Sequence, residues 1–307
     1  MTTALLTHSD CLQHVNPPGA PEQVARLKYV LNALEDLDLL RLDAPKATQD
    51  QISLVHDADY VASIPGRMPK DEIIHLDPDT YVSATSLNAI LRASGGAVHA
   101  VNTILDGHAK NAFVATRPPG HHAEQATPMG FCIFGNVAIA AKHAMDVRGL
   151  NRVAVLDFDV HHGNGTQALL EGDARVLFAS SHQMPLWPGS GHASETGPHN
   201  TVMNLPLSTG SGRNEWRAAW DSVLTRVRAH EPDMIFISAG FDAHQDDPLA
   251  GLNWTVADFA EITQNICTLA QELCEGRVVS VLEGGYDLDA LAASARAHVE
   301  ELVKAAT

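Results

Sequence analysis

Carboxylate and imidazole side chains gather in a few short segments of this 307-residue sequence. In the segment from Asp157 to Thr166, Asp157, Asp159 and His161 stand at alternate positions. In an extended chain such residues point to one face, so two of them can bind one ion. Asp242, in a distant Gly-Phe-Asp segment, offers another carboxylate. Two carboxylates and an imidazole suit a catalytic zinc with one position left for water, which makes Asp159, His161 and Asp242 the predicted metal ligands.

A second segment, from Arg117 to His122, reads Arg-Pro-Pro-Gly-His-His. Its prolines fix φ and limit how the loop moves, which suits the positioning of two imidazoles. Beside a metal site, His121 and His122 are predicted to carry out proton transfer. Such imidazoles need an acceptor at the far ring nitrogen, and Asp157 and Asn164 are candidates for that role. An isolated His-His pair would instead be an ordinary surface feature.

A third segment, from Glu283 to Tyr286, places a tyrosine behind two glycines. The glycines allow close approach of the backbone, and the Tyr286 hydroxyl could donate a hydrogen bond to a developing oxyanion opposite the metal. Alone, Gly-Gly-Tyr more often marks the end of a strand. Its position beside the other segments favours the active-site role.

These segments need a scaffold that brings them together. Short apolar runs alternate with longer amphipathic patterns, which predicts parallel strands joined by crossover helices in an α/β fold. Ligand sites of such sheets lie at the carboxyl ends of the strands. All four segments are expected there: the Asp157–Thr166, Arg117–His122 and Glu283–Tyr286 segments and the Gly-Phe-Asp segment that ends at Asp242. The expected strands are Ala4–Thr7, Ala112–Ala115, Val153–Phe158, Val176–Ser180, Val202–Leu205, Met234–Ser238 and Val278–Leu282, and the expected helices Pro21–Leu40, Ser83–Asp106, Gly135–Asp146, Asn214–His230, Val256–Cys274 and Asp287–Lys304.

Composition narrows the partners. The formal net charge of -17 argues against nucleic acid and favours cationic substrates. No apolar run is long enough for a membrane span, and the first residues lack the features of a secretory signal. The four cysteines form no Cys-x-x-Cys pair, which favours a reducing compartment. We therefore predict a cytoplasmic protein with no membrane partner, folded as a single domain over residues 1–307.

In order and spacing, the four segments resemble the zinc-dependent histone deacetylase superfamily, closest to its class II and bacterial deacetylase-like amidohydrolase branch. The resemblance spans nearly the whole chain. It implies an arginase-like open sheet of eight parallel strands flanked by helices, with one zinc per chain. It further implies that Tyr286 polarises the acyl carbonyl and that His121 and His122 share the proton transfer. In this family pattern Asp157 would orient His121, and Asn164 would orient His122.

The same resemblance implies a narrow tunnel for an acylated aliphatic amine. Its expected substrate-binding residues are Gly130, Phe131 and Trp187, where better-known members carry phenylalanine in place of the tryptophan. The segment from His14 to Arg26 is similar to the family's loop at the tunnel mouth, with Ala20 where a histidine is common. A structural potassium is implied near Asp157, Asp159, His161 and Ser180.

The superfamily acts on acetyl-lysine side chains or on acetylated polyamines. A polyamine-selective relative carries a glutamate where this sequence has Leu249, so acetyl-lysine-type substrates are predicted, with Leu249 as a substrate-binding residue. Asp246 and Asp247 keep the acetylpolyamine alternative open, because either could supply the missing carboxylate. Two further alternatives are a dimanganese ureohydrolase on a similar fold and a catalytically silent module that binds acylated amines.

Overall fold

The computed structural model describes residues 2–307 and is built around an eight-stranded sheet with the order β2-β1-β5-β10-β9-β6-β7-β8. Every neighbouring pair in it is parallel, which confirms the predicted α/β class. A separate two-stranded antiparallel sheet pairs β3 with β4. The strands are β1 Thr3–Thr7, β2 Leu40–Asp43, β3 Ile74–His75, β4 Tyr81–Val82, β5 Asn111–Val114, β6 Val153–Asp157, β7 Val176–Gln183, β8 Val202–Leu207, β9 Met234–Ala239 and β10 Val278–Leu282.

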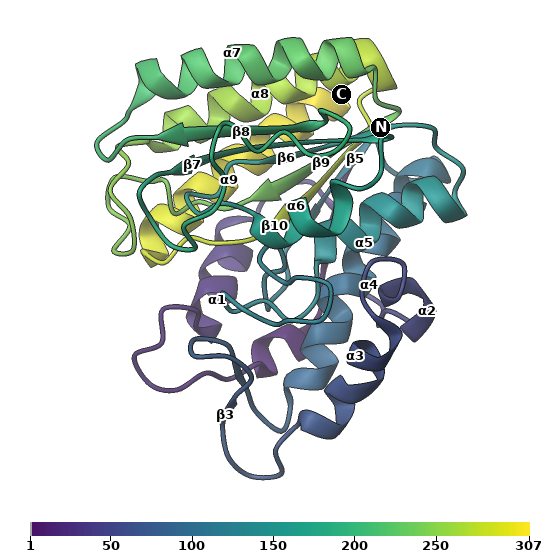
Figure 1. Ribbon diagram of the computed structural model, residues 1–307, viewed down its shortest axis with the longest axis vertical. Coiled ribbons are helices and arrows are strands. Elements are labelled where there is room, and N and C mark those ends of the chain that lie inside the picture. The colour runs from purple at the N-terminus through teal and green to yellow at the C-terminus, as the bar shows by residue number, and fades with distance from the viewer. Residues whose placement is uncertain (1) are drawn as a thin grey trace.

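Helices cover both faces of the large sheet. In Figure 1, α7, α8 and α9 lie along one face, and α4 and α5 lie on the other side of the sheet. Helix α1 packs beside α9. The helices are α1 Val24–Ala33, α2 Gln49–Ile52, α3 Ala58–Ser63, α4 Ser86–Leu105, α5 Asn136–Lys142, α6 Asn164–Leu170, α7 Arg213–His230, α8 Val256–Cys274 and α9 Leu288–Ala306, with short turns of 3-10 or π helix at Ser9–Gln13, Ile64–Arg67 and His143–Val147.

Strand β9 shows why the sheet is covered on both sides. Met234 and Phe236 pack into the core under α4 and α5. Ile235 and Ile237 pack into the core under α7 to α9. Because side chains alternate between the faces, a strand buried on both sides is a continuous apolar run, as in parallel sheets generally.

One expected element is wrong. The sequence pattern predicts a helix from Pro21 to Leu40, but α1 ends at Ala33 and the edge strand β2 begins at Leu40. In β2 the partly buried Leu40 and Leu42 alternate with more exposed polar residues. Such a four-residue alternation is too short to be separated from the helical pattern that precedes it, and only pairing with β1 makes it a strand.

The strand order places the four segments side by side. Strands β5, β10, β9 and β6 are consecutive neighbours in the sheet, and each is followed directly by one segment. Within residues 2–307, no helix is long and apolar enough to cross a membrane. The cysteines at 11, 132, 267 and 274 are buried free thiols.

The buried imidazole of His298 predicts an acid-sensitive core. It lies on α9, with Nδ1 at 2.6 Å from the Thr263 hydroxyl and Nε2 at 2.8 Å from the Ser280 hydroxyl. Burial lowers its pKa to about 3. The folded ring therefore stays neutral, while the unfolded chain binds a proton below about pH 6.5, so stability is present above pH 6.5 and is lost as the pH falls. Between pH 7.5 and 5.0 this group should lower the unfolding free energy by about 2 kcal/mol.

Urea unfolding of the protein and of His298→Gln at both pH values measures this effect. The variant should be less stable at pH 7.5, yet its loss of stability on acidification should be smaller by about 2 kcal/mol. The exposed His108, changed to Gln, is the matched control and should leave the acid dependence as it is. Equal acid dependence in the protein and in His298→Gln would contradict the prediction.

Candidate active site

The predicted metal ligands come together at the carboxyl end of the sheet. Asp159 and His161 follow β6, and Asp242 follows β9. Their ligand atoms lie within 4.8 Å of one another, and all three residues are buried. His161 Nδ1 is 3.1 Å from Asp159 Oδ1 and 3.2 Å from Asp242 Oδ2. The structure therefore brings one nitrogen and two carboxylates to a single point.

The electrostatics of this cluster fit a divalent cation. Burial, and after it the neighbouring Asp159, raises the pKa of Asp242 to about 7, since two carboxylates face each other there. Burial opposes a charge on His161, but the two carboxylates raise its pKa to about 10. A metal ion would replace that proton, because bound imidazole must be neutral and the carboxylates ionised. The oxygen and nitrogen donors are those that zinc accepts.

Backbone contacts hold the carboxylates in place. The N–H of Gly284 donates to Asp159 Oδ2 over 2.8 Å, and the N–H of Val160 donates to Asp242 Oδ1 over 2.8 Å. A Cβ atom at position 284 would lie 2.2 Å from Asp242 Oδ2, so only glycine fits there. Gly284 thus leaves room for the metal ligands.

The two histidines of the Arg117–His122 segment lie in contact, with ring centroids 3.9 Å apart. His121 Nδ1 donates to Asp157 Oδ2 over 2.9 Å, and His122 Nδ1 donates to Asn164 Oδ1 over 2.8 Å. Both pairings are those that the family resemblance implies. Asn164 begins α6 and in turn donates to Glu124, which fixes the orientation of its amide. His122 Nε2 therefore remains an acceptor.

The environments of the two rings push their pKa values apart. Burial opposes a charge on His121, but the carboxylates of Asp159 and Asp157 raise its pKa well above the ordinary value. For His122, burial and the neighbouring His121 lower the pKa. Titratable neighbours whose pKa values diverge in this way are suited to different acid and base roles.

A cavity of about 200 Å³ leads from the surface to this cluster. The predicted substrate-binding residues Gly130, Phe131, Trp187 and Leu249 all line it, together with His122, His161, Tyr286, Leu186 and Asp79. The Trp187 ring lies edge-on to His122, with centroids 4.7 Å apart, and Phe131 faces Tyr286 at 5.9 Å. At Gly130, where φ is 57°, a Cβ atom would lie 2.5 Å from both His122 and Trp187. Only glycine therefore fits at position 130 in the cavity wall.

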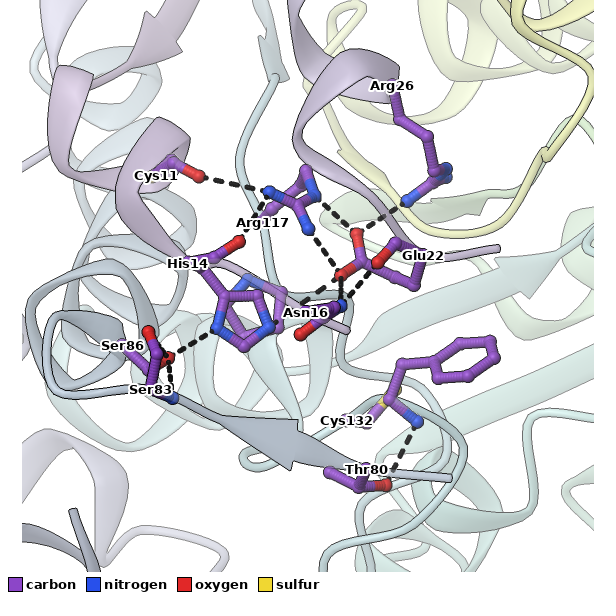
Figure 2. A network of polar contacts seen from close by, with 12 residues as sticks. Cys11, His14, Asn16, Glu22, Arg26, Thr80, Ser83, Ser86, Arg117 and Cys132 are labelled. Carbon is purple, nitrogen blue, oxygen red and sulfur yellow. Dashed lines mark hydrogen bonds and ion pairs between the residues drawn. The ribbon is translucent and has the colours of Figure 1, made fainter. Parts of the chain in front are cut away.

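Buried ion pairs support the site from the N-terminal side (Figure 2). The carboxylate of Glu22 lies between the guanidinium groups of Arg117 and Arg26. Burial opposes the charge of Glu22, but Arg117 lowers its pKa to about 2. Arg26 donates to the carbonyls of Glu283 and Gly285, and its guanidinium lies 4.9 Å from the centre of the Tyr286 ring. The segment expected only at the tunnel mouth therefore also anchors the histidine loop and the tyrosine.

Sequence reasoning missed Asp79 and did not foresee the backbone contacts that Asp247 and Glu283 make. Asp79, in the loop between β3 and β4, lines the cavity and accepts from the Gly130 N–H at 3.0 Å. Asp247 is buried and accepts from the N–H groups of Leu249 and Tyr286. Glu283 accepts from the N–H groups of the histidine loop. Each acts through backbone contacts across the chain, which no local sequence pattern encodes.

Ser180, named for a potassium site, is buried on β7 and pairs with Asp157 on β6 in the sheet register. Its hydroxyl lies 3.0 Å from His182 Nδ1. It is thus adjacent to Asp157, one of the residues implied with it. Potassium at this position stays a prediction.

Comparison with known proteins assigns the class. The sequence pattern of the histone deacetylase domain matches residues 20–302. The chain belongs to the histone deacetylase family, as the motifs predicted.

Among its relatives, a probable deacetylase of Archaeoglobus fulgidus is 37% identical, over 94% of this chain and 82% of that protein. Human polyamine deacetylase HDAC10 is 35% identical, over 99% of this chain and 48% of that protein. The crystal structure of the HDA15 HD domain superposes with a TM-score of 0.92 at 32% identity, and covers 99% of this chain and 88% of that one.

Proposed function

We propose that this protein is a zinc-dependent amidohydrolase that removes acetyl groups from acetyl-lysine-type side chains. The observation that carries the proposal is the buried Asp159, His161 and Asp242 cluster at the base of a narrow cavity that His122 and Tyr286 also line. In this proposal residues 1–307 form one deacetylase domain that acts in the cytoplasm and holds potassium as a structural ion.

Asp159, His161 and Asp242 would hold the zinc, which when bound supplies a Lewis acid to polarise the acyl carbonyl. The chain's own groups do the remaining work. His122 lines the cavity, and its Nε2 is free to take the proton of the attacking water and later to give a proton to the leaving amine. His121, whose Nδ1 donates to Asp157, lies in contact with His122 and would share this proton transfer.

Tyr286 supplies the hydroxyl that donates to the acyl oxygen as charge develops there. Its ring is fixed between Arg26 and Phe131. Phe131 and Trp187 would hold an aliphatic stem between aromatic walls. The cavity therefore suits a linear acylated amine whose bulky remainder stays outside.

One metal cluster favours this chemistry over that of a ureohydrolase. Within residues 2–307, Asp159, His161 and Asp242 form the single metal-ligand group, while a dimanganese site needs further bridging carboxylates. A silent binding module would not need a base, its acceptor and a tyrosine beside the metal ligands. Metal content per chain, together with turnover of a fluorogenic acetyl-lysine substrate, tests the proposal. Less than one zinc or no turnover would contradict it.

The structure bears on the acetylpolyamine alternative through the loop after Asp242. Asp247 does not line the cavity, and its two carboxylate oxygens accept the backbone N–H groups of Leu249 and Tyr286. Asp246 does not line the cavity, and its side chain is 64% exposed. Leu249 lines the cavity at its mouth and offers only an apolar surface. Within this loop, therefore, no carboxylate lines the cavity, which supports acetyl-lysine-type substrates.

Leu249→Glu is expected to shift preference toward acetylated polyamines. A carboxylate at the mouth can pair with the further ammonium group that a polyamine carries, and a hydrogen bond to a charged group is worth roughly 1.5 to 3 kcal/mol. The ratio of kcat/KM for acetylspermidine to that for an acetyl-lysine peptide should therefore rise by about tenfold or more. Parallel kinetics on both substrates measure this ratio.

Leu249→Gln is the matched control, because glutamine has nearly the same size as glutamate but carries no charge. It should leave the substrate ratio close to that of the unmodified protein. A clear polyamine preference in the unmodified protein, or an equal shift in both variants, would overturn the assignment.

A further inference from the structure

Glu283 is a buried carboxylate for which the proposed chemistry has no use. It follows β10 directly, three residues before Tyr286, and is fully buried. Its Oε2 accepts from the N–H of Gly120 at 2.7 Å and from the N–H of His121 at 3.2 Å. Its Oε1 accepts from the Ser238 hydroxyl at 3.3 Å. One side chain at the end of β10 thus bonds the loop that follows β5 and the neighbouring strand β9.

The backbone of Glu283 is fixed as firmly as its side chain. Its N–H donates to the carbonyl of Ala239 at 3.0 Å, and its carbonyl accepts from Arg26 at 2.6 Å. The carboxylate therefore sits on a rigid base. A group held in this way can define where its partners lie.

The partners are N–H groups in the loop that carries the two histidines. Among the residues that the structure describes, Gly120 and His121 donate these N–H groups to no other acceptor. On the opposite side, the Asn136 side chain donates to the carbonyl of Pro118 at 3.2 Å. A Cβ atom at Gly120 would lie 2.6 Å from the backbone nitrogen of Asn136. The loop is thus confined between Asn136 and Glu283.

We propose that Glu283 is a positioning residue, whose Oε2 atom fixes the backbone of Gly120 and His121 and so sets the rings of His121 and His122 relative to the metal ligands. This inference rests on the proposed hydrolysis. Misplacement of a catalytic group by about 1 Å can cost on the order of 100-fold in rate, so a single acceptor at this point has a measurable effect.

The role belongs to the acceptor oxygen. Burial raises the pKa of Glu283 to about 7. The fold tolerates a polar group at this buried position because its hydrogen bonds are made. A glutamine can direct its amide oxygen to the same two N–H groups and its amide nitrogen to Ser238. A methionine has similar length but no oxygen, and an aspartate holds its oxygens about 1.5 Å further back.

Kinetics of three variants test the proposal. Glu283→Met should lose about 10- to 100-fold in kcat, with KM within about threefold and metal content unchanged, because the metal ligands and cavity walls are intact. Glu283→Asp should lose kcat in the same way. Glu283→Gln should restore most of the kcat that the methionine variant loses. If the methionine variant does not fold, the Asp and Gln variants alone decide.

A measurement without substrate separates this inference from the proposed function. Hydrogen exchange of the Gly120 and His121 amides should be at least about tenfold faster in Glu283→Met or Glu283→Asp than in the unmodified protein, because the amides lose their acceptor. Faster exchange in a protein with no hydrolytic activity would refute the proposed function and leave the positioning role standing. Unchanged exchange would refute the positioning role alone.

Ser280→Ala is the matched structural control. Ser280 lies on β10, the strand that leads to Glu283, is buried, and bonds His298 away from the site. It should lower stability without changing kcat or exchange at Gly120 and His121. Full kcat in Glu283→Met, or a glutamine variant as slow as the methionine variant, would overturn the proposal.

Discussion

Asp242→Ala should leave a folded protein that no longer holds its metal and has lost nearly all hydrolytic activity. Asp242 is one of only two carboxylates in the cluster, and it comes from a different strand end than Asp159 and His161. Its removal leaves two adjacent ligands from one loop, too few for a tight site. A Lewis acid supplies several kcal/mol to such a reaction, so turnover should fall by at least about 1000-fold.

Metal content after dialysis and turnover of an acetyl-lysine substrate measure this loss. Asp242→Asn is a second variant, since its amide oxygen can still accept from the Val160 N–H and so preserve the loop. Asp246→Ala is the control, because Asp246 lies in the same loop and does not line the cavity. Tight binding of one zinc with retained activity in Asp242→Ala would show that the ligand assignment is wrong.

Most of the site could be predicted from sequence because it is local to strand ends. Asp157, Asp159 and His161 follow one apolar strand at alternate positions, and the carboxyl ends of parallel strands lie on one edge of the sheet. Reactive side chains that follow several of the strands must therefore lie at the same edge of the sheet. The sheet order β5-β10-β9-β6 makes these ends adjacent, a fact that the sequence pattern alone does not contain.

The parts that sequence did not predict depend on distant contacts. Glu22 forms an ion pair with Arg117, which is 95 residues away in the sequence. Arg26 donates to the carbonyl of Gly285, which is 259 residues away. Neither pairing follows from periodicity, because a charged residue near a chain end is ordinarily on the surface. Asp79 was missed for a similar reason. It stands in a polar Asp-Pro-Asp-Thr stretch that is typical of a turn, and only the fold carries it to the cavity.

The residues of the tunnel wall could be predicted by family resemblance, although no local sequence pattern indicates them. Phe131 and Trp187 were expected through family resemblance, and the structure places both on the cavity wall. Trp187 is 42% exposed, so one edge of its ring forms the rim while the other faces His122. The tryptophan ring is larger than the phenylalanine of better-known members, and it therefore extends the cavity wall toward the mouth of the cavity.

Tyr286→Phe should fold normally and bind substrate nearly as well, yet lose about 100- to 1000-fold in kcat, the effect of deleting one oxyanion donor. The phenylalanine ring can keep the contacts with Arg26 and Phe131, so the cavity wall is preserved. What disappears is the hydroxyl, whose hydrogen bond strengthens only as negative charge develops on the acyl oxygen. An interaction made mainly in the transition state lowers kcat more than it raises KM.

Steady-state kinetics on an acetyl-lysine peptide, with metal content measured on the same samples, test this expectation. Tyr60→Phe is the matched control, because the Tyr60 hydroxyl is also buried and donates to the carbonyl of Ile133 at 2.8 Å, outside the cavity. That variant should lose stability and keep its kcat within a few fold. A drop in kcat shared by both variants would point to a general packing effect. An unchanged kcat in Tyr286→Phe would remove this hydroxyl from the chemistry and leave the metal to stabilise the charge on the acyl oxygen.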